Sequence, residues 1–327
     1  MMDIYFESNY GKLYEEAEHG KAMRWSYTGD AGTVSHMFII RRIPELINNE
    51  TYFDIVTPYG YGGPIIEQIN NGYSKKELVS IFQKEFEVYC IENKIVSEFI
   101  RFHPIVNNGI DFKSVYDSIC IRNTVGTNLR DYNDPVSSEF SKGCRKNIRQ
   151  AINKGISWRI TKKPDSIDVF KDIYYSTMDR NNAVDYYYFN DNYFQCCLDW
   201  FKDNIILVEA IFEKRTIAAS LCFIYDKTIH IHLSGTLSEY LYLSPAYILR
   251  YAATLWGKEN GYEVIHHGGG RSNAKDDSLF TFKKQFGQHT LFDFYVGKRI
   301  WNQKIYDELV ERHRGIKDSG FFPAYRG

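Results

Sequence analysis

The segment from Ile229 to Gly297 constrains the fold of this chain more than any other, because short apolar runs alternate there with helical patterns. Strand-like runs are expected at 229–236, 262–267 and 290–296, and helices at 244–256 and around 282–287. Ser244 is a favourable N-cap residue and Pro245 suits the first helical position, so the first of these helices is expected to begin there. This order predicts a β-α-β-α-β unit in a mixed α/β protein.

The expected start of that helix is also a candidate anion site. The first-turn amides of a helix have no partner within the helix and carry partial positive charge. Such an end can hold a phosphate or a pyrophosphate, and the amides near Ala246 would provide the contacts. A capped helix without any ligand is the competing interpretation.

The overall composition sets limits on size and partners. A chain of 327 residues that is 44% hydrophobic can form one large domain or two ordinary domains with buried cores. Forty basic residues against 41 acidic residues give a formal net charge of -1. Proteins that bind long nucleic acids are usually more basic, so DNA is not an expected partner, whereas a local basic pocket for a small anion is compatible with this balance.

The six cysteines are scattered and show no C-x-x-C spacing, which argues against a zinc site. Adjacent Cys196 and Cys197 do not suggest a disulfide framework, so reduced thiols in a cytoplasmic protein are expected. The sequence has no N-terminal apolar h-region and no apolar span of about 18 residues. We therefore expect neither a signal peptide nor a membrane helix.

Both halves of the chain show antiparallel strands, then a helix, then further strands, which suggests two copies of one supersecondary plan. In the first half, Ser74 is expected to cap a helix over 75–92. In the second half, helices are expected over 140–154, capped by Ser137 or Ser138, and over 165–180. A boundary near residue 130 would give domains at 1–130 and 131–327 that pack closely.

Four motifs in order along the chain resemble the Fem-type branch of the GNAT acyltransferase superfamily. They are Tyr5-Phe6 followed by Tyr10, the run Phe53-Asp-Ile-Val-Thr-Pro-Tyr-Gly60, the basic segment 141–155 that ends at glycine, and the segment 268–287 that begins with three glycines and ends in Phe282-Lys-x-x-Phe-Gly287. The resemblance implies two tandem GNAT-like domains and transfer of an acyl group to an amine. The chain lacks the coiled-coil arm that longer Fem-type members insert.

Within this superfamily, the preferred interpretation is an N-acyltransferase that moves an acyl group from acyl-CoA to a nucleotide-linked amino sugar by direct attack. The alternative is an aminoacyl-tRNA-dependent transferase that acts on a peptidoglycan precursor. In that case the basic helix with Lys142, Arg145, Lys146 and Arg149 would contact the tRNA; a solvated face is the other interpretation. A second alternative is a non-catalytic protein that binds a glycan or a peptide.

Direct acyl transfer needs a neutral amine, a donor for the tetrahedral oxyanion, and a proton or a positive field at the leaving group. His267 ends a strand at the glycine run and is the first candidate base, while His266 should face the other way. Asp179 is the second candidate base. Lys283 matches the lysine of the family motif, and the resemblance places it near the reacting groups or a phosphate.

The remaining predicted contacts fall into two groups. The donor cofactor is expected to contact Ser234, Gly235, Ser244, Ala246, Tyr247 and Phe286. The acceptor substrate is expected to contact Tyr59, Tyr61, Arg101, His103, Arg180, Tyr186, Tyr188 and Arg271, with Tyr59 and Tyr61 in a cleft between the halves. His230 and His232 share a strand face, but no third ligand stands near them in the sequence, so no metal is expected.

Overall fold

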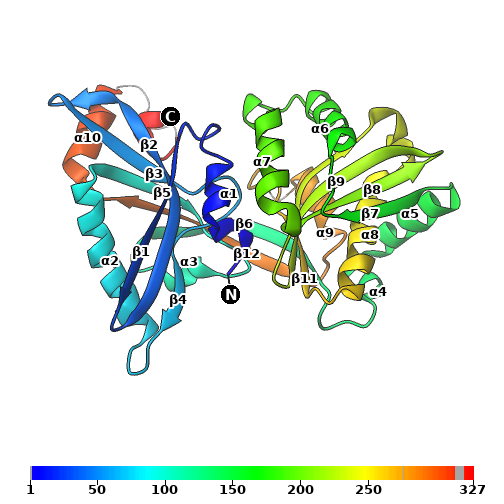
Figure 1. Cartoon of the computed structure of the whole chain (residues 1–327), viewed down its shortest axis with the longest axis horizontal. Coiled ribbons are helices and arrows are strands. Elements are labelled where there is room, and N and C mark those ends of the chain that lie inside the picture. Colours follow the sequence, from blue (N-terminus) through cyan, green and yellow to red (C-terminus); the bar gives the residue numbers. More distant parts are fainter. Residues whose placement is uncertain (1, 275, 314–319) are drawn as a thin grey trace. The chain divides into compact units, whose positions relative to one another are not determined.

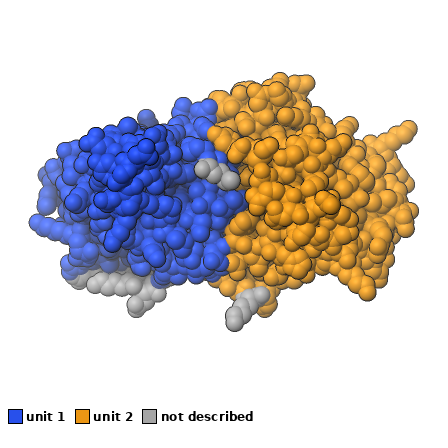
Figure 2. All heavy atoms as spheres, turned by 90° about the horizontal axis from the view of Figure 1, so that it is seen from below, with its two compact units in different colours: residues 1–122, 293–327 blue, residues 123–292 orange. Residues whose placement is uncertain are grey.

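The computed structural model describes residues 2–274, 276–313 and 320–327. The chain divides into two compact units (Figure 2). Unit 1 comprises residues 1–122 and 293–327, and unit 2 comprises residues 123–292. The last 35 or so residues therefore pack with the first part of the chain, while the predicted division into folding domains after residue 130 stays a prediction.

The sheet of unit 1 has the strand order β1-β2-β3-β5-β12, and β4 pairs with β2 (Figure 1). These strands span Gly20–Gly29 (β1), Gly32–Ile47 (β2), Glu50–Val56 (β3), Ile65–Ile69 (β4), Ile95–Arg101 (β5) and Leu291–Ile300 (β12). Strands β3 and β5 are parallel, and the neighbouring pairs are antiparallel. The helices are α1 (Ser8–Lys12), α2 (Lys75–Glu92), α3 (Asn108–Asp111) and α10 (Gln303–Arg312).

Helix α2 forms for reasons that are visible in the sequence. Ser74 accepts a hydrogen bond from the amide of Glu77, and the Glu77 carboxylate accepts one from the amide of Ser74, which completes a capping box. The helix buries Phe82 and Phe86 against Trp25 of β1, with ring centroids 5.6 and 5.1 Å apart. This packing holds α2 on one face of the sheet.

The sheet of unit 2 has the strand order β6-β11-β10-β9-β8-β7, and its β10 and β11 are parallel. These strands span Asp117–Asn128 (β6), Ser157–Lys162 (β7), Ile205–Phe212 (β8), Arg215–Tyr225 (β9), Thr228–Thr236 (β10) and Val264–Gly268 (β11). The helices are α4 (Pro135–Glu139), α5 (Lys142–Asn153), α6 (Asp168–Arg180), α7 (Asp191–Phe201), α8 (Pro245–Glu259) and α9 (Ser278–Lys284).

Helices cover both faces of the unit 2 sheet. Successive side chains of a strand point to opposite faces. On β9, Cys222 therefore packs in the core beneath α5 and α8, whereas Phe223 meets Phe201 at the end of α7, with ring centroids 5.6 Å apart. The result is an α/β arrangement in which α8 contacts five strands from β7 to β11.

The strands and longer helices expected from the sequence are present, but several details differ. The basic helix begins at Lys142 and is capped by Ser141, because Ser137 lies inside the separate short helix α4. Strand β4 lies in the turn-rich region after Gly60, and helix α7 was not expected. Its signal was Asn190, whose side chain caps the helix by accepting from the amide of Tyr193.

The predicted fold class, a mixed α/β protein, is confirmed by both units. No helix within the described ranges combines the length and the hydropathy that a membrane crossing requires. One glycine has a strict packing role near the end of α9. Gly287, the end of the Phe282-Lys-x-x-Phe-Gly287 motif, lies so close to β6 that an added Cβ would stand 1.9 Å from the carbonyl oxygen of Gly126.

Gly287→Ala should therefore lower the free energy of unfolding by at least about 1–3 kcal/mol, because the obstructing atom belongs to the backbone and cannot turn away. Chemical denaturation measures this change. Gly143→Ala is the matched control, since a Cβ there meets only the Ser141 hydroxyl at 4.0 Å within a helix. The control should gain about 0.5–1 kcal/mol. Equal stability of the two variants would contradict this account of the motif.

Candidate active site

Strand β11 presents two histidines to opposite faces of the sheet, as its alternation predicts. The Nε2 atom of His266 lies 2.9 Å from the hydroxyl of Thr124. The Nε2 atom of His267 lies 2.8 Å from the hydroxyl of Thr127. The strand ends at Gly268, whose φ of +75° lets the chain turn into the glycine run.

The hydrogen bonds around His267 fix its tautomer. Thr127 donates its hydroxyl proton to the carbonyl oxygen of Phe286 at 2.6 Å, so His267 Nε2 must be the donor to Thr127. The Nδ1 atom of His267 then carries a lone pair, and no described residue bonds to this atom. The ring is 1% exposed, and burial together with the nearby charges of Arg250 and Lys283 lowers its pKa well below 6.5. His267 is therefore neutral at pH 7.

Arg250 brings an unexpected charge into this region. It lies on α8 and is only 5% exposed, with its guanidinium carbon 5.6 Å from the centroid of the Phe282 ring. Its Nε atom has no hydrogen-bond partner, and no carboxylate of the described residues lies within ion-pair distance. Burial lowers the pKa of Arg250 to about 10. A buried cation without a counter-ion is costly for the folded state, so its presence points to a ligand.

Lys283 extends from α9 back to the glycine run. Its Nζ atom donates to the carbonyl oxygen of Gly269 at 2.7 Å, which places the ammonium group at the end of β11. The motif lysine and the first candidate base of the sequence analysis therefore lie in one region, since the charge of Lys283 acts on His267.

Asp277 organises the loop between β11 and α9. Its carboxylate accepts hydrogen bonds from the amides of Arg271, Ser272 and Phe280 and from the Ser272 hydroxyl. These bonds lower the pKa of Asp277 to about 2, chiefly through the Phe280 amide. Sequence reasoning did not single out Asp277, although its place as the N-cap of α9 was a usable signal.

An aromatic cluster supports these polar groups from within. The ring of Phe286 is fully buried and lies 5.8 Å from His267, 5.5 Å from Tyr247 and 5.2 Å from Phe282. We call the whole group the α8–α9 cluster; it consists of Tyr247, Arg250, His267, Phe282, Lys283 and Phe286. It combines two cations with one unpaired nitrogen lone pair, which suits the binding of a polar or anionic reacting group.

A second predicted group gathers at the end of α6. The Tyr188 hydroxyl donates to the Asp179 carboxylate at 2.9 Å. Arg180 donates to the carbonyl oxygen of Thr236 at 2.6 Å and contacts the Ser238 hydroxyl at 3.1 Å. Tyr186 lies in the 3-10 turn Asp185–Tyr187 beside them. Asp179 is exposed, and its hydrogen bond is the largest cause that raises the pKa of Tyr188.

The residues predicted to hold the donor occupy several places in unit 2. The Ser234 hydroxyl lies 2.7 Å from that of Ser220, and Gly235 packs closely against the backbone of Ile173. Ser244 begins α8 in a left-handed conformation with φ of 57°, and its side chain makes no capping hydrogen bond. The expected side-chain cap at this helix is therefore wrong, because a left-handed residue does not aim its hydroxyl at the first-turn amides. The Arg271 side chain is exposed.

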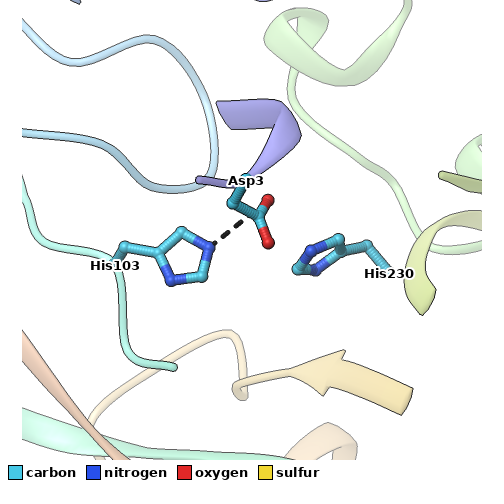
Figure 3. Close-up of side chains that lie close together, drawn as sticks. All are labelled: Asp3, His103 and His230. Atoms are coloured by element: carbon cyan, nitrogen blue, oxygen red, sulfur yellow. Dashed lines mark ion pairs between the residues drawn. The ribbon is translucent and has the colours of Figure 1, made fainter. Parts of the chain in front are cut away.

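The four predicted substrate contacts of unit 1 lie on or near β5. The ring of Tyr61 lies 5.7 Å from that of His103, and the Nε2 atom of His103 lies 3.5 Å from the carboxylate of Asp3 (Figure 3). The carbonyl oxygen of Tyr59 accepts a hydrogen bond from the Tyr10 hydroxyl. Arg101 donates to the Thr57 carbonyl oxygen at 2.9 Å.

Comparisons with known proteins agree with this fold. Residues 105–215, less than half of the chain, match the FemAB family. No curated protein matches the chain by sequence. A crystal structure of FemX superposes with a TM-score of 0.70 over 94% of both chains, at 14% sequence identity. L-PGS from Bacillus licheniformis gives a TM-score of 0.55 over 91% of this chain and 94% of that one, at 12% identity.

A conserved protein of unknown function from Bacteroides thetaiotaomicron gives a TM-score of 0.53 over 89% of this chain and 90% of that one, at 10% identity. These likenesses confirm the predicted fold class, a mixed α/β protein. The family match confirms the predicted enzyme class, an acyltransferase that acts on an amine.

Acid should weaken the fold through His267. Unfolded histidine titrates near about 6.5, and the pKa of folded His267 lies well below this value. Between the two values the unfolded chain binds more protons, so stability falls as pH falls below about 6.5, by up to about 1.4 kcal/mol per pH unit for this residue. His267→Gln keeps a hydrogen-bond donor for Thr127 but cannot take up a proton. In this variant the free energy of unfolding should therefore fall less steeply with falling pH, by the contribution of one proton. Equal slopes in urea unfolding between pH 5 and 7 would contradict the assignment.

Arg250→Met should raise the free energy of unfolding by about 1–3 kcal/mol, because it replaces an unpartnered buried charge by a side chain of similar length. Arg41→Met is the contrasting control, since Arg41 pairs with the buried carboxylate of Asp54 at 2.8 Å and its loss should lower stability. Denaturant titration of both variants checks whether their free energies of unfolding change in opposite directions. A destabilised Arg250→Met protein would mean that the charge is already compensated within the fold.

Proposed function

We propose that this protein transfers an aminoacyl group from aminoacyl-tRNA to the amine of a peptidoglycan precursor. The observation that carries the proposal is the position of Lys283, at the glycine end of β11, in a fold that FemX shares over 94% of the chain. The FemAB match supports this donor and acceptor over acyl-CoA and a nucleotide-linked amino sugar, because Fem-type enzymes use the former pair.

In the proposed reaction the neutral amine attacks the ester carbonyl carbon of the donor. A C–N bond forms, the C–O bond to the terminal ribose breaks, and a proton leaves the amine and ends on the ribose oxygen. The ammonium group of Lys283 is suited to stabilise the oxyanion and to donate to the leaving oxygen. Its hydrogen bond to Gly269 holds it in place before the substrate binds.

His267 and Asp179 remain the proposed proton acceptors. His267 offers an Nδ1 lone pair that no described residue occupies, and its low pKa suits brief acceptance of a proton rather than storage of one. Asp179 is ionisable, exposed and bound to Tyr188, so it would act on an acceptor held at the end of α6. Comparison of transfer by the variants His267→Gln and Asp179→Asn distinguishes the two, because each removes one candidate proton acceptor.

Arg250 gives the α8–α9 cluster a role for a negative or strongly dipolar group. The proposed partner of the Arg250 guanidinium is the ester carbonyl oxygen, which becomes anionic in the reaction, or a phosphate next to the reacting ester. The first-turn amides of α8 near Ala246 stay proposed phosphate contacts, since the backbone phosphates of tRNA are anions like a pyrophosphate. The Ser244 amide is already engaged, because it donates to the carbonyl oxygen of Leu241. Arg180, Tyr186, Tyr188 and Arg271 of unit 2 and Tyr59, Tyr61, Arg101 and His103 of unit 1 stay proposed acceptor contacts.

The donor is identified by offering two classes of donor to the purified protein. One reaction contains charged tRNA and a nucleotide-linked peptidoglycan precursor, and transfer is followed by the mass of the product. The other contains acyl-CoA with a panel of amino sugars, and thiol release is followed with a disulfide reagent. Product in the first reaction supports the proposal, and amine-dependent thiol release with no product in the first overturns it.

Lys283→Met should lower the rate of transfer by at least about tenfold, because it removes one transition-state donor, and should leave the melting temperature unchanged. Lys284→Met is the matched control, one residue further along α9, and should react at the rate of the unaltered protein. Unaltered transfer by Lys283→Met would remove Lys283 from the reacting centre.

A further inference from the structure

The segment 140–164 contains eight basic residues and no acidic residue, although the whole chain has 40 basic residues against 41 acidic ones. The basic residues are Lys142, Arg145, Lys146, Arg149, Lys154, Arg159, Lys162 and Lys163. The segment forms helix α5 and the edge strand β7 of unit 2. The rest of the chain is acidic on balance, so this positive charge is a local feature.

Helix α5 sorts its residues by face. Cys144, Ile148 and Ala151 are buried in the core of unit 2. Lys142, Lys146 and Arg149 follow spacings of four and three, so they lie together on one face, and all three are exposed. We call these three residues the α5 basic face.

The α5 basic face has no compensating charge. Other cations of the segment are engaged: Arg159 binds Glu209 through two hydrogen bonds, and Lys163 pairs with Asp203. None of the residues that the structure describes offers a carboxylate within ion-pair distance to Lys142, Lys146 or Arg149. Repulsion between like charges on one helical face opposes helix formation, and Lys142 at the first position also opposes the helix dipole. The arrangement thus disfavours the isolated helix and suits binding to a polyanion.

Aromatic side chains extend the surface beyond the helix. After α5, Lys154 contacts the exposed ring of Tyr242, with its Nζ atom 5.8 Å from the centroid. Trp158 on β7 is 38% exposed. Flat exposed rings beside cations are suited to stacking on unpaired bases, as in proteins that bind single-stranded nucleic acids.

We propose that the α5 basic face is the docking surface for the duplex arm of an RNA, and this proposal rests on the proposed function, in which the acyl donor is a tRNA. The face is about 10 Å long, from the rise of 1.5 Å per helical residue. Successive phosphates on one strand of a duplex lie closer together than this length, so the three cations span a few phosphates. Contacts of this kind do not depend on the RNA sequence, so one surface can accept tRNAs that carry different amino acids.

The direct test is binding of a fluorescent minihelix RNA with a short stem and a single-stranded 3′ end. The variant Lys142→Gln/Lys146→Gln/Arg149→Gln should bind at least about tenfold more weakly at low salt, and its slope of log affinity against log salt should fall by about two to three. The matched control Lys76→Gln/Lys84→Gln/Lys113→Gln removes three exposed lysines of unit 1 and should bind as the unaltered protein does. Circular dichroism shows whether both variants keep their fold.

Transfer assays separate this proposal from the proposed function. With aminoacyl-tRNA as donor, the α5 variant should raise KM at least about tenfold and keep kcat. With an aminoacyl ester of a dinucleotide, which is too short to carry a duplex arm, the variant should react like the unaltered protein. Equal RNA binding and equal KM in the variant and the control overturn the docking surface while transfer by the unaltered protein upholds the function.

Two further outcomes also decide against the docking surface. One is an unaltered protein that does not bind the minihelix. The other is a variant that loses binding to vesicles of anionic phospholipid but keeps binding to RNA, which would assign the α5 basic face to a lipid surface. Absence of transfer from any aminoacyl-tRNA, with retained salt-dependent binding of the minihelix, would instead remove the proposed reaction and keep the RNA surface.

Discussion

The contact between β6 and the end of α9 is the constraint on which the candidate site depends. The Thr127 hydroxyl joins the two elements, because it donates to the Phe286 carbonyl oxygen and accepts from His267. Gly287 lets the backbones meet directly beside this bond. The position of Lys283, four residues before that glycine, follows from how closely α9 can approach the sheet. The spacing between Lys283 and Gly287 is thus a packing requirement that also places a cation.

Arg250 is a buried cation whose missing counter-charge a ligand could supply. Most buried charges in this protein are satisfied within the fold, as Glu98 is by His36 and Trp301. Arg250 differs because, among the residues that the structure describes, its recorded side-chain contact is the face of the Phe282 ring. A protein that keeps such a group loses stability until a ligand supplies the missing negative charge, and it gains an electrostatic field that is oriented before the ligand arrives. Stability and function therefore oppose each other at this residue.

Local chemistry made much of the fold predictable from the sequence. The capping box at Ser74 and the apolar stripe that follows it allowed the bounds of α2 to be predicted from the sequence. The alternation of side chains along a strand predicted that His266 and His267 face opposite sides of the sheet. The site was only partly predictable. Lys283 and His267 came from a motif and a strand end, whereas Arg250 stands in an apolar helix, and its isolation depends on which carboxylates the fold leaves distant. No spacing rule contains that information.

The loop that Asp277 fastens has a consequence for how the protein meets acid. A carboxylate whose folded pKa is depressed to about 2 contributes its stability above the unfolded value of about 3.9 and gives it up only as pH falls toward 2. The glycine turn beside Lys283 therefore keeps the stability that Asp277 provides until the pH falls below about 3.9, whereas the stability that depends on a neutral His267 begins to fall below about pH 6.5. In an acidifying compartment the fold would therefore begin to lose the contribution of His267 before it lost the contribution of Asp277.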